Sequence, residues 1–229
     1  MHILFSNNSL RRMGMNQISN DATVKTTQKS LAAVRGLRGE IVRKLLHFLV
    51  ALVPLMASVD KNLTLLLLGT GVIFYIIVEK LRQEGVEVLV ISDLTIFASR
   101  DRDKGRFVLG PVTLGLGAML ALALYPEPAS RIAIYALAFG DGFASLAGKL
   151  IGGIRLPFTR GKTLAGTLAC FITVWIIAFR ILGNPAYALL IAGVAAFLEA
   201  LPTEDLDNVL LPAGTGLFVS LLLGLRLLI

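Results

Sequence analysis

The sequence predicts an all-α membrane protein, a polytopic bundle of about seven transmembrane helices with its amino terminus in the cytosol. The chain has 229 residues, of which 55% are hydrophobic and 16% are charged, whereas soluble globular chains carry about 25% charged residues. Apolar blocks recur along it, each about 20 residues long, which is the length that spans a ~30 Å hydrocarbon core. These observations exclude a water-soluble fold, and we expect no separate soluble domain.

Polar and proline-rich segments separate the predicted spans. The first 30 residues are mostly polar and predict a flexible cytosolic tail, which leaves residues 31–229 as the transmembrane domain. Asp60 to Asn62 ends the first span, and Pro126 to Pro128 ends the third. The single cysteine, Cys170, lies within an apolar block, so neither a disulfide framework nor a cysteine metal site is expected. The expected spans are Leu45–Val59, Leu63–Val78, Phe107–Tyr125, Ile132–Ile151, Leu164–Ile181, Ala186–Leu201 and Val209–Leu225.

The positions of the basic residues indicate the topology. With seven spans, 18 of the 22 Lys and Arg residues fall in the tail and in the internal loops, and Lys61, Arg131, Arg180 and Arg226 fall on the other side. Because cytoplasmic loops are enriched in Lys and Arg, this asymmetry puts the amino terminus inside. It also accounts for the net charge of +7, so we expect no nucleic-acid partner. The mixed-charge run from Glu79 through Arg100 to Arg106 predicts a solvated face.

Two polar groups stand where a lipid-facing helix would have none. Glu40, Arg43, Lys44 and His47 follow a spacing of i, i+3, i+4, i+7, which places them on one helix face where the first span leaves the cytosol. Such a stripe must face protein or water, and with His47 included it favours a site over a snorkelling helix end. In the fourth span, Asp141 lies ~15 Å from the outer edge if the helix is straight. A carboxylate at that depth is expected to face the bundle interior.

Glycines accompany these polar groups. Gly140 and Gly142 flank Asp141 and permit either a close backbone approach or a local break in the helix. Gly148 and Gly152 form a small-xxx-small pair, which is more often simple helix packing. In the third span, glycines 115 and 117 would allow another helix to pack closely.

The loop from Gly152 to Lys162 carries Arg155, Arg160 and Lys162, followed by Thr163 and then Gly166 and Thr167 in the next span. A Walker A motif is excluded because its first glycine would fall at Leu156 and no strand precedes the loop. A glycine-rich turn with Lys and Thr at a helix amino terminus nevertheless favours an anion, for which phosphate is the natural candidate.

The last internal loop is acidic and has no basic residue. Glu204, Asp205 and Asp207 lie in it, and Glu199 precedes it within the sixth span. Asp207 alone is as well explained as a helix cap. Together, Asp141, Glu199 and Asp207 would suit a Mg²⁺ ion that bridges phosphates. This arrangement of acids and bases predicts phosphoryl or nucleotidyl transfer at the membrane surface.

Four segments in order resemble the family of integral membrane enzymes that contains dolichol kinase, phytol kinase and CTP-dependent diacylglycerol kinase. The matching residues are Glu40-x-x-Arg43-Lys44-x-x-His47, Gly140-Asp141-Gly142-x-Ala144-x-x-x-Gly148-Lys149-x-x-Gly152, Lys162-Thr163-x-x-Gly166-Thr167, and Glu199-x-x-Pro202 leading to Asp207-Asn208-x-x-x-Pro212. The resemblance covers about residues 36 to 216 and identifies residues 31–229 as a catalytic domain.

The resemblance implies a lipid kinase that transfers the γ-phosphoryl group of CTP to a membrane lipid alcohol (a polyprenol or dolichol, phytol or diacylglycerol) at the cytosolic face. It implies Mg²⁺ as cofactor, held by Asp141, Glu199 and Asp207. It gives catalytic roles to Asp141, Lys149, Lys162 and His47. The nucleotide and its phosphates would be bound by Arg43, Lys44, Gly140, Gly142, Gly148, Gly152, Thr163, Gly166 and Thr167.

Two alternatives remain open from the sequence. A phosphatidate cytidylyltransferase would also use CTP, Mg²⁺ and a membrane lipid, but its acidic and basic signature near the carboxyl end is not evident. A transporter would use Asp141 and the glycine-broken helix as its binding site. Against it, seven spans do not divide into two repeats, and the remaining polar residues gather at one side of the membrane. The oligomeric state and the identity of the lipid alcohol are not indicated.

Overall fold

The computed structural model describes residues 39–86, 95 and 105–226. The chain divides into two units, Met1–Gly39 and Glu40–Ile229, and the second contains the bundle and the site described below. The predicted tail, residues 1–30, lies outside the described residues. Within the described ranges the chain is helical with no β-strand, apart from an isolated bridge between Arg155 and Thr163.

The helices follow the predicted spans. The first runs over Gly39–Val59 and ends in α2 (Val53–Val59). The elements that follow it are α3 (Lys61–Gln83), α5 (Gly110–Leu124), α6 (Ala129–Tyr135), the π-helix η2 (Ala136–Asp141), α7 (Gly142–Leu150), α8 (Leu164–Leu182), α9 (Pro185–Ala200), the 3₁₀-helix η3 (Glu204–Leu206) and α10 (Asp207–Arg226). Because α6, η2 and α7 are continuous, they correspond to the single predicted fourth span.

Four helices of the described part are long and apolar enough to cross a membrane, namely Gly39–Val59, α3, α8 and the portion Asp207–Gly224 of α10. The helices α5 and α9 are apolar but shorter. The predicted all-α membrane bundle is therefore confirmed as a fold class. The orientation of the amino terminus stays a prediction.

Local sequence explains where the helices begin and end. The side chains of Asp60, Thr163 and Asn184 accept hydrogen bonds from backbone N–H groups in the first turns of α3, α8 and α9, as N-cap residues do. Gly183 ends α8 in the left-handed conformation, with φ 67°. The segment Pro126 to Pro128 ends α5 as predicted. The turns before α3 and α9 are thus short and capped, and α2 packs against α3 while α8 packs against α9.

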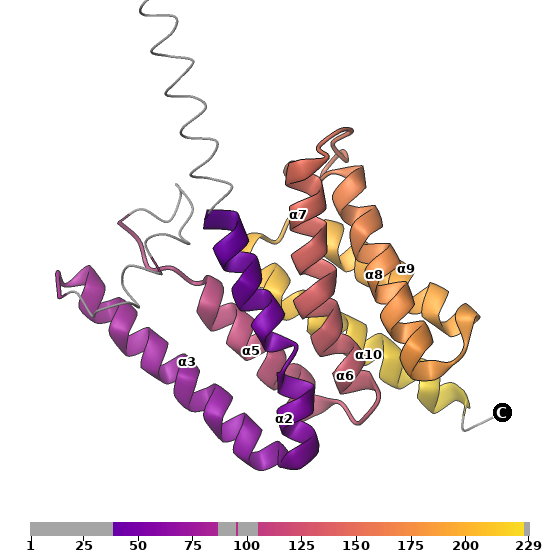
Figure 1. Cartoon of the computed structure of the whole chain (residues 1–229), viewed down its shortest axis with the longest axis horizontal. Coiled ribbons are helices and arrows are strands. Elements are labelled where there is room, and N and C mark those ends of the chain that lie inside the picture. Colours follow the sequence, from indigo (N-terminus) through magenta and orange to yellow (C-terminus); the bar gives the residue numbers. More distant parts are fainter. Residues whose placement is uncertain (1–38, 87–94, 96–104, 227–229) are drawn as a thin grey trace, which may run out of the picture. The chain divides into compact units, whose positions relative to one another are not determined.

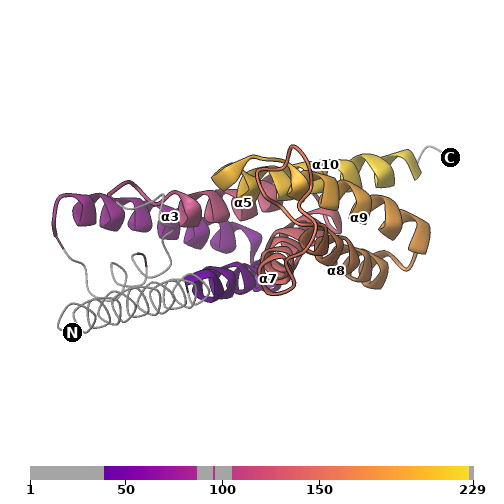
Figure 2. The same cartoon turned by 90° about the horizontal axis from the view of Figure 1, so that it is seen from above.

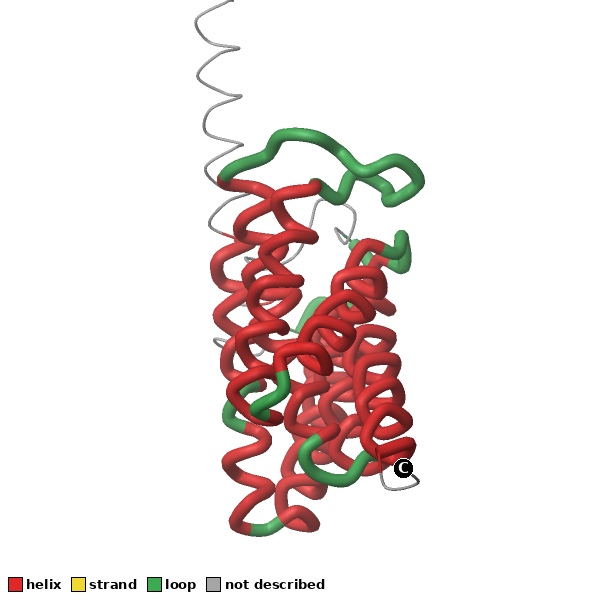
Figure 3. The backbone as a smooth tube through the Cα atoms, turned by 90° about the vertical axis from the view of Figure 1, so that its right-hand side faces the viewer, coloured by secondary structure: helices red, strands yellow, loops and turns green. Residues whose placement is uncertain are grey.

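The helices lie in two rows (Figures 1 and 2). One row contains α3, α5 and α10, and the other contains the helix Gly39–Val59, α7 and α8. At one edge α9 packs against both α8 and α10 and so closes the bundle. The main hydrophobic core lies among α6, η2, α8, α9 and α10. Figure 3 shows the loop between α7 and α8 at one end of the bundle and the turns after α2 and α8 at the other.

The fourth span stays helical at Asp141. Rather than breaking there, the chain widens into the π-helix η2, which ends at Asp141; such π-turns occur frequently at functional sites. Gly142 allows the close approach that the sequence predicts, because a Cβ atom built on it would lie 2.5 Å from the ring of Phe48. The first helix and the fourth span are therefore in direct contact.

The prediction of a solvated face is wrong for Glu79. Its side chain is 1% exposed, accepts two hydrogen bonds of 2.7 Å from Arg82, and accepts a third from the backbone N–H of Val108 at 2.9 Å. A buried carboxylate is tolerated when charged and neutral donors surround it in this way. Glu79 thus joins the end of α3 to the start of α5. The part of the charged run from 96 to 104 lies outside the described residues.

Candidate active site

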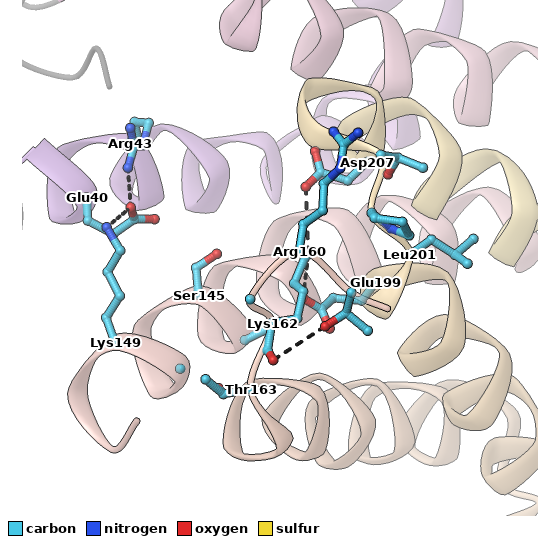
Figure 4. Close-up of a pocket in the computed structure, with 16 residues that line it drawn as sticks. Glu40, Arg43, Ser145, Lys149, Arg160, Lys162, Thr163, Glu199, Leu201 and Asp207 are labelled. Carbon is cyan, nitrogen blue, oxygen red and sulfur yellow. Dashed lines mark hydrogen bonds and ion pairs between the residues drawn. The ribbon is translucent and has the colours of Figure 1, made fainter. Parts of the chain in front are cut away.

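One end of the bundle contains a polar cavity of about 450 Å³, which is within the usual size range of small-molecule sites. Four parts of the chain form its wall: the start of the helix Gly39–Val59, α7, the loop that leads into α8, and the turn between α9 and α10 (Figure 4). The residues that line it are Glu40, Arg43, Ala144, Ser145, Gly148, Lys149, Thr159, Arg160, Gly161, Lys162, Thr163, Glu199, Leu201, Pro202, Thr203 and Asp207.

Lys162 stands between Glu199 and Asp207, two of the acidic residues that line the cavity. Its Nζ lies 2.7 Å from Oε1 of Glu199 and 3.8 Å from Oδ2 of Asp207. Burial of Lys162 disfavours its charged form, but the carboxylates of Glu199, Asp141 and Asp207 outweigh burial and raise the pKa of Lys162 above its usual value. Lys162 is therefore a firmly charged ammonium group inside the cavity.

Glu199 is the most enclosed carboxylate of the cavity wall near α8. Its side chain is 3% exposed, and its second oxygen accepts a hydrogen bond of 3.1 Å from the hydroxyl of Thr167. Thr167 and Lys162 belong to one predicted motif and Glu199 to another. The structure therefore brings two of the predicted motifs together at this carboxylate.

A second ion-pair group forms the opposite wall. Glu40, on the first helix, accepts hydrogen bonds from Arg43 one turn later and from Lys149 at the end of α7. Figure 4 shows both cationic side chains directed at this carboxylate. Glu40 is 3% exposed while Lys149 is 46% exposed. The buried Glu40 carboxylate thus pairs with Lys149, whose side chain remains nearly half exposed.

Asp141 lies behind the cavity wall and does not line it. Its carboxylate accepts a hydrogen bond from Lys44 and lies 3.1 Å from Nδ1 of His47, and all three side chains are buried. The polar stripe predicted on the first helix therefore faces the bundle interior. Direct contact of Asp141 with Mg²⁺ or with a lipid hydroxyl requires the Lys44 pair to open, so that role stays a prediction.

Most of the predicted phosphate-binding glycines are sites of close helix packing in this structure. A Cβ atom on Gly140 would lie 3.1 Å from Val174, and one on Gly166 would lie 2.7 Å from the carbonyl oxygen of Ala144. Gly148 lines the cavity and also faces the hydroxyl of Thr163, at 2.9 Å from a built Cβ. Small residues here let α7 and α8 approach closely. Gly152 does not line the cavity; it has φ +64° and allows the turn after α7.

The loop into α8 carries Arg160 and Lys162 to the cavity. Backbone hydrogen bonds from Leu156 to Lys162 and from Leu164 to Ile154, both 2.9 Å, close the loop into a hairpin. The hydroxyl of Thr163 accepts from the backbone N–H of Gly166 at 3.2 Å. Thr163, at the amino terminus of α8, thus lines the cavity together with the cationic Arg160 and Lys162, and a helix amino terminus beside cations favours a bound anion.

The described residues contain no group of three or more His, Cys, Asp or Glu side chains arranged to hold a metal ion. Asp141 does not line the cavity, whereas the other two predicted ligands do. Glu199 and Asp207 do converge, since both approach the same Lys162 nitrogen. Mg²⁺ is usually bound by one or two carboxylates together with substrate phosphates. These two residues fit that mode.

Several residues of the cavity could not be predicted from the sequence. Thr159, Thr203 and Leu201 line it, but nothing in their spacing distinguishes them from loop or core residues. Ser145 and Arg160 lie within the predicted motif segments, but no individual role was predicted for either. The signal for Ser145 was its position one turn beyond Asp141 on the same helix face.

Comparison with known proteins supports one family. A probable chloroplastic phytol kinase of Triticum aestivum is 24% identical over 144 residues, covering 55% of this chain and 48% of that protein. Probable phytol kinase 3 of Glycine max is 31% identical over 142 residues, covering 55% and 44%. The dolichol kinase of Mus musculus is 29% identical over 198 residues, covering 75% and 36%. The chain is similar to phytol and dolichol kinases.

The resemblance inferred from the four motifs is thereby confirmed. The chain spans half or less of the length of these curated relatives. Neither a protein-family profile nor a solved structure matches the chain. The likeness to phytol and dolichol kinases therefore rests on sequence, and the cavity described above is the place where its motifs meet.

Proposed function

We propose that this protein is a lipid-alcohol kinase that transfers the γ-phosphoryl group of a nucleoside triphosphate to the hydroxyl of an isoprenoid alcohol in the membrane. The observation that carries the proposal is the convergence of Lys149, Arg160 and Lys162 with Glu199 and Asp207 on one cavity at the end of a bundle of apolar helices. The names of the relatives, phytol kinase and dolichol kinase, supply the substrate class.

Phosphoryl transfer asks little covalent chemistry of the protein. The reacting groups must be aligned, and the charge that spreads over the transferred group must be neutralised. Lys162 and the amino terminus of α8 would bind the phosphates on one side, and Lys149 on the other. The lipid oxygen forms a bond to the γ-phosphorus while the bond to the β–γ bridging oxygen breaks, so the nucleoside diphosphate leaves and the hydroxyl proton is released.

We assign CTP as the donor and Mg²⁺ as the cofactor from the family resemblance. Glu199 and Asp207 would hold the ion, which supplies positive charge against the phosphate oxygens when bound. Glu199 already accepts hydrogen bonds from Lys162 and Thr167. These donors fix the orientation of the carboxylate.

The acceptor would enter from the inner leaflet. In the proposed topology the cavity lies at the cytosolic end of the helices, where the basic loops gather. The hydroxyl of a lipid alcohol resides at the same depth as the headgroups, while its chain stays among the apolar helices. The reaction thus takes place at the cytosolic membrane surface.

A direct assay tests this function. The purified protein in lipid nanodiscs is given radiolabelled CTP or ATP, with Mg²⁺ and one of phytol, a polyprenol, diacylglycerol or phosphatidate, and the lipid product is identified. We expect a lipid monophosphate from an isoprenoid alcohol. Release of pyrophosphate with phosphatidate would instead show a cytidylyltransferase, and the absence of any lipid product with all donors would contradict the kinase.

A variant of Lys162 tests the site within the same assay. Lys162→Gln removes the charge that faces Glu199 and Asp207, and a loss of about a hundredfold or more in kcat/KM for the nucleotide is expected, in line with the loss of one charge-stabilising donor. The matched control is Lys61→Gln, at an exposed lysine that is the first residue of α3, and this variant should retain activity. Equal activity of the two variants would show that Lys162 has no role in the reaction.

A further inference from the structure

The residue after Asp207 connects α10 to α5. The side chain of Asn208 is 6% exposed, and its Nδ2 donates to the hydroxyl oxygen of Thr113 at 3.0 Å and to the backbone carbonyl of Gly110 at 3.4 Å. Thr113 is also buried, and its hydroxyl lies 3.0 Å from the same Gly110 carbonyl. The first turn of α10 is therefore bonded to the first turn of α5.

The backbone of Asn208 makes a second contact with α5. Pro212 lies four residues later within α10 and has no N–H, so the carbonyl of Asn208 lacks its usual helical donor. That carbonyl is directed at Gly117, where a built Cβ atom would lie 2.0 Å from the oxygen. Only a glycine leaves room at this point. Pro212 thus frees the carbonyl of Asn208, and Gly117 leaves the space that this carbonyl occupies.

The start of α5 is itself fixed to α3. Glu79 accepts from the N–H of Val108, and the hydroxyl of Tyr75 donates to the Val108 carbonyl at 3.1 Å. At the other end of α5, the hydroxyl of Tyr125 donates to the carbonyl of Ala213 at 2.7 Å. The start of α5 is therefore bonded to α3, and its end is bonded to α10. These contacts allow α5 to fix the position of α10 in the bundle.

From this geometry we propose that Asn208 and Thr113 are positioning residues of the site, which set the place of the Asp207 carboxylate in the cavity. Asp207 is the first residue of α10, and its carboxylate lies 3.8 Å from the Lys162 nitrogen. Neither Asn208 nor Thr113 lines the cavity. The inference rests on the proposed kinase function for its catalytic consequence, whereas the anchoring of α10 does not depend on it.

Kinetics of Thr113 variants test the positioning role. Thr113→Val keeps the side-chain shape and removes the acceptor for Asn208, so turnover should fall about tenfold or more, since misplacement of a catalytic group by ~1 Å has effects of this size. The KM for the lipid alcohol should not change. Thr113→Ser retains the hydroxyl and should restore turnover to near the wild-type level.

A double-mutant cycle separates positioning from general destabilisation. If Thr113 acts through Asp207, Thr113→Val causes no further loss of turnover in the Asp207→Asn background, because interacting sites are not additive. The same fold loss in both backgrounds would overturn the proposal, as would wild-type turnover of Thr113→Val.

Hydrogen exchange provides a readout that needs no activity. Amide exchange in residues 207–211 should be faster in Thr113→Val than in wild type or Thr113→Ser, while exchange in α8 and α9 stays unchanged. Unchanged exchange in residues 207–211 would also overturn the proposal. If the wild type transfers no phosphate, the proposed function fails, and the exchange measurement alone still decides whether Thr113 anchors α10.

Discussion

At the scale of single residues, three buried carboxylates of the bundle are each paired with a lysine. Lys44 lies against Asp141, Lys149 against Glu40, and Lys162 against Glu199. Each of these pairs joins two different helices or a helix and a loop. Because an unpaired charge in a low-dielectric interior is costly, these pairs specify which helices are neighbours.

The pair of Lys44 and Asp141 leads to a prediction about stability. Asp141→Asn leaves Lys44 buried without its counter-charge, and removal of one partner of a buried pair costs about 3–5 kcal/mol. We expect this variant to have no turnover and a lower thermal midpoint in detergent. The double variant Lys44→Met/Asp141→Leu buries no charge at this position, so its thermal midpoint should return close to that of wild type.

Activity of the double variant defines the role of the pair. We expect it to remain inactive, because His47 and the neighbouring cavity wall lose the carboxylate that orients them. A low thermal midpoint in the double variant would contradict the structural part of the prediction. Wild-type turnover in it would show that the reaction does not need Asp141.

At the scale of elements, the site depends on how closely α7 and α8 approach. The Glu40–Lys149 pair and the Lys162–Glu199 pair lie on opposite walls of one cavity, and the loop from α7 to α8 spans the distance between them. Gly148 and Gly166 set the separation of the two helices at this end. Larger residues there would widen the cavity and move the cations apart.

Gly166→Ala tests this spacing. The added methyl group would lie 2.7 Å from the backbone carbonyl oxygen of Ala144, and backbone cannot rotate away as a flexible side chain can, so α7 must shift. We expect a lower thermal midpoint together with weaker nucleotide binding. Gly193→Ala, in α9 with open space around the position, should leave the midpoint unchanged or raise it slightly. Similar effects of the two substitutions would show that the contact with Ala144 is unimportant.

The sequence predicts the helices well because each apolar block and its polar ends are formed by residues close together in the sequence. Asp60, Thr163 and Pro126 mark helix ends in the structure as in the sequence. The burial of Glu79 could not be predicted in this way, because it depends on Val108, which lies just before α5 and is distant in the sequence. The same holds for the position of Asp141 behind the cavity, which follows from the pairing of the first helix with the fourth span. Contacts between distant segments were thus the part that local pattern could not supply.

At the scale of the whole molecule, the charged residues of the site gather at one end of the bundle. The helix start at Glu40, the loop before α8 and the turn before α10 all line the polar cavity. Lys61 is the first residue of α3, and the turn between α2 and α3 lies at the opposite end (Figures 1 and 3). The distribution of basic residues in the sequence assigns the cavity end to the cytosol.

This topology can be tested with single cysteines, because the native Cys170 is fully buried. Phe158, at 96% exposure in the loop between α7 and α8, and the exposed Lys61 are each replaced by cysteine. A membrane-impermeant maleimide should label Phe158→Cys only in inside-out vesicles and Lys61→Cys only in right-side-out vesicles. Wild-type protein is the control and should stay unlabelled. Labelling of both variants from one side would contradict the helix arrangement. The reverse pattern would keep the arrangement and place the cavity on the outer face, where cytosolic nucleotide cannot reach it.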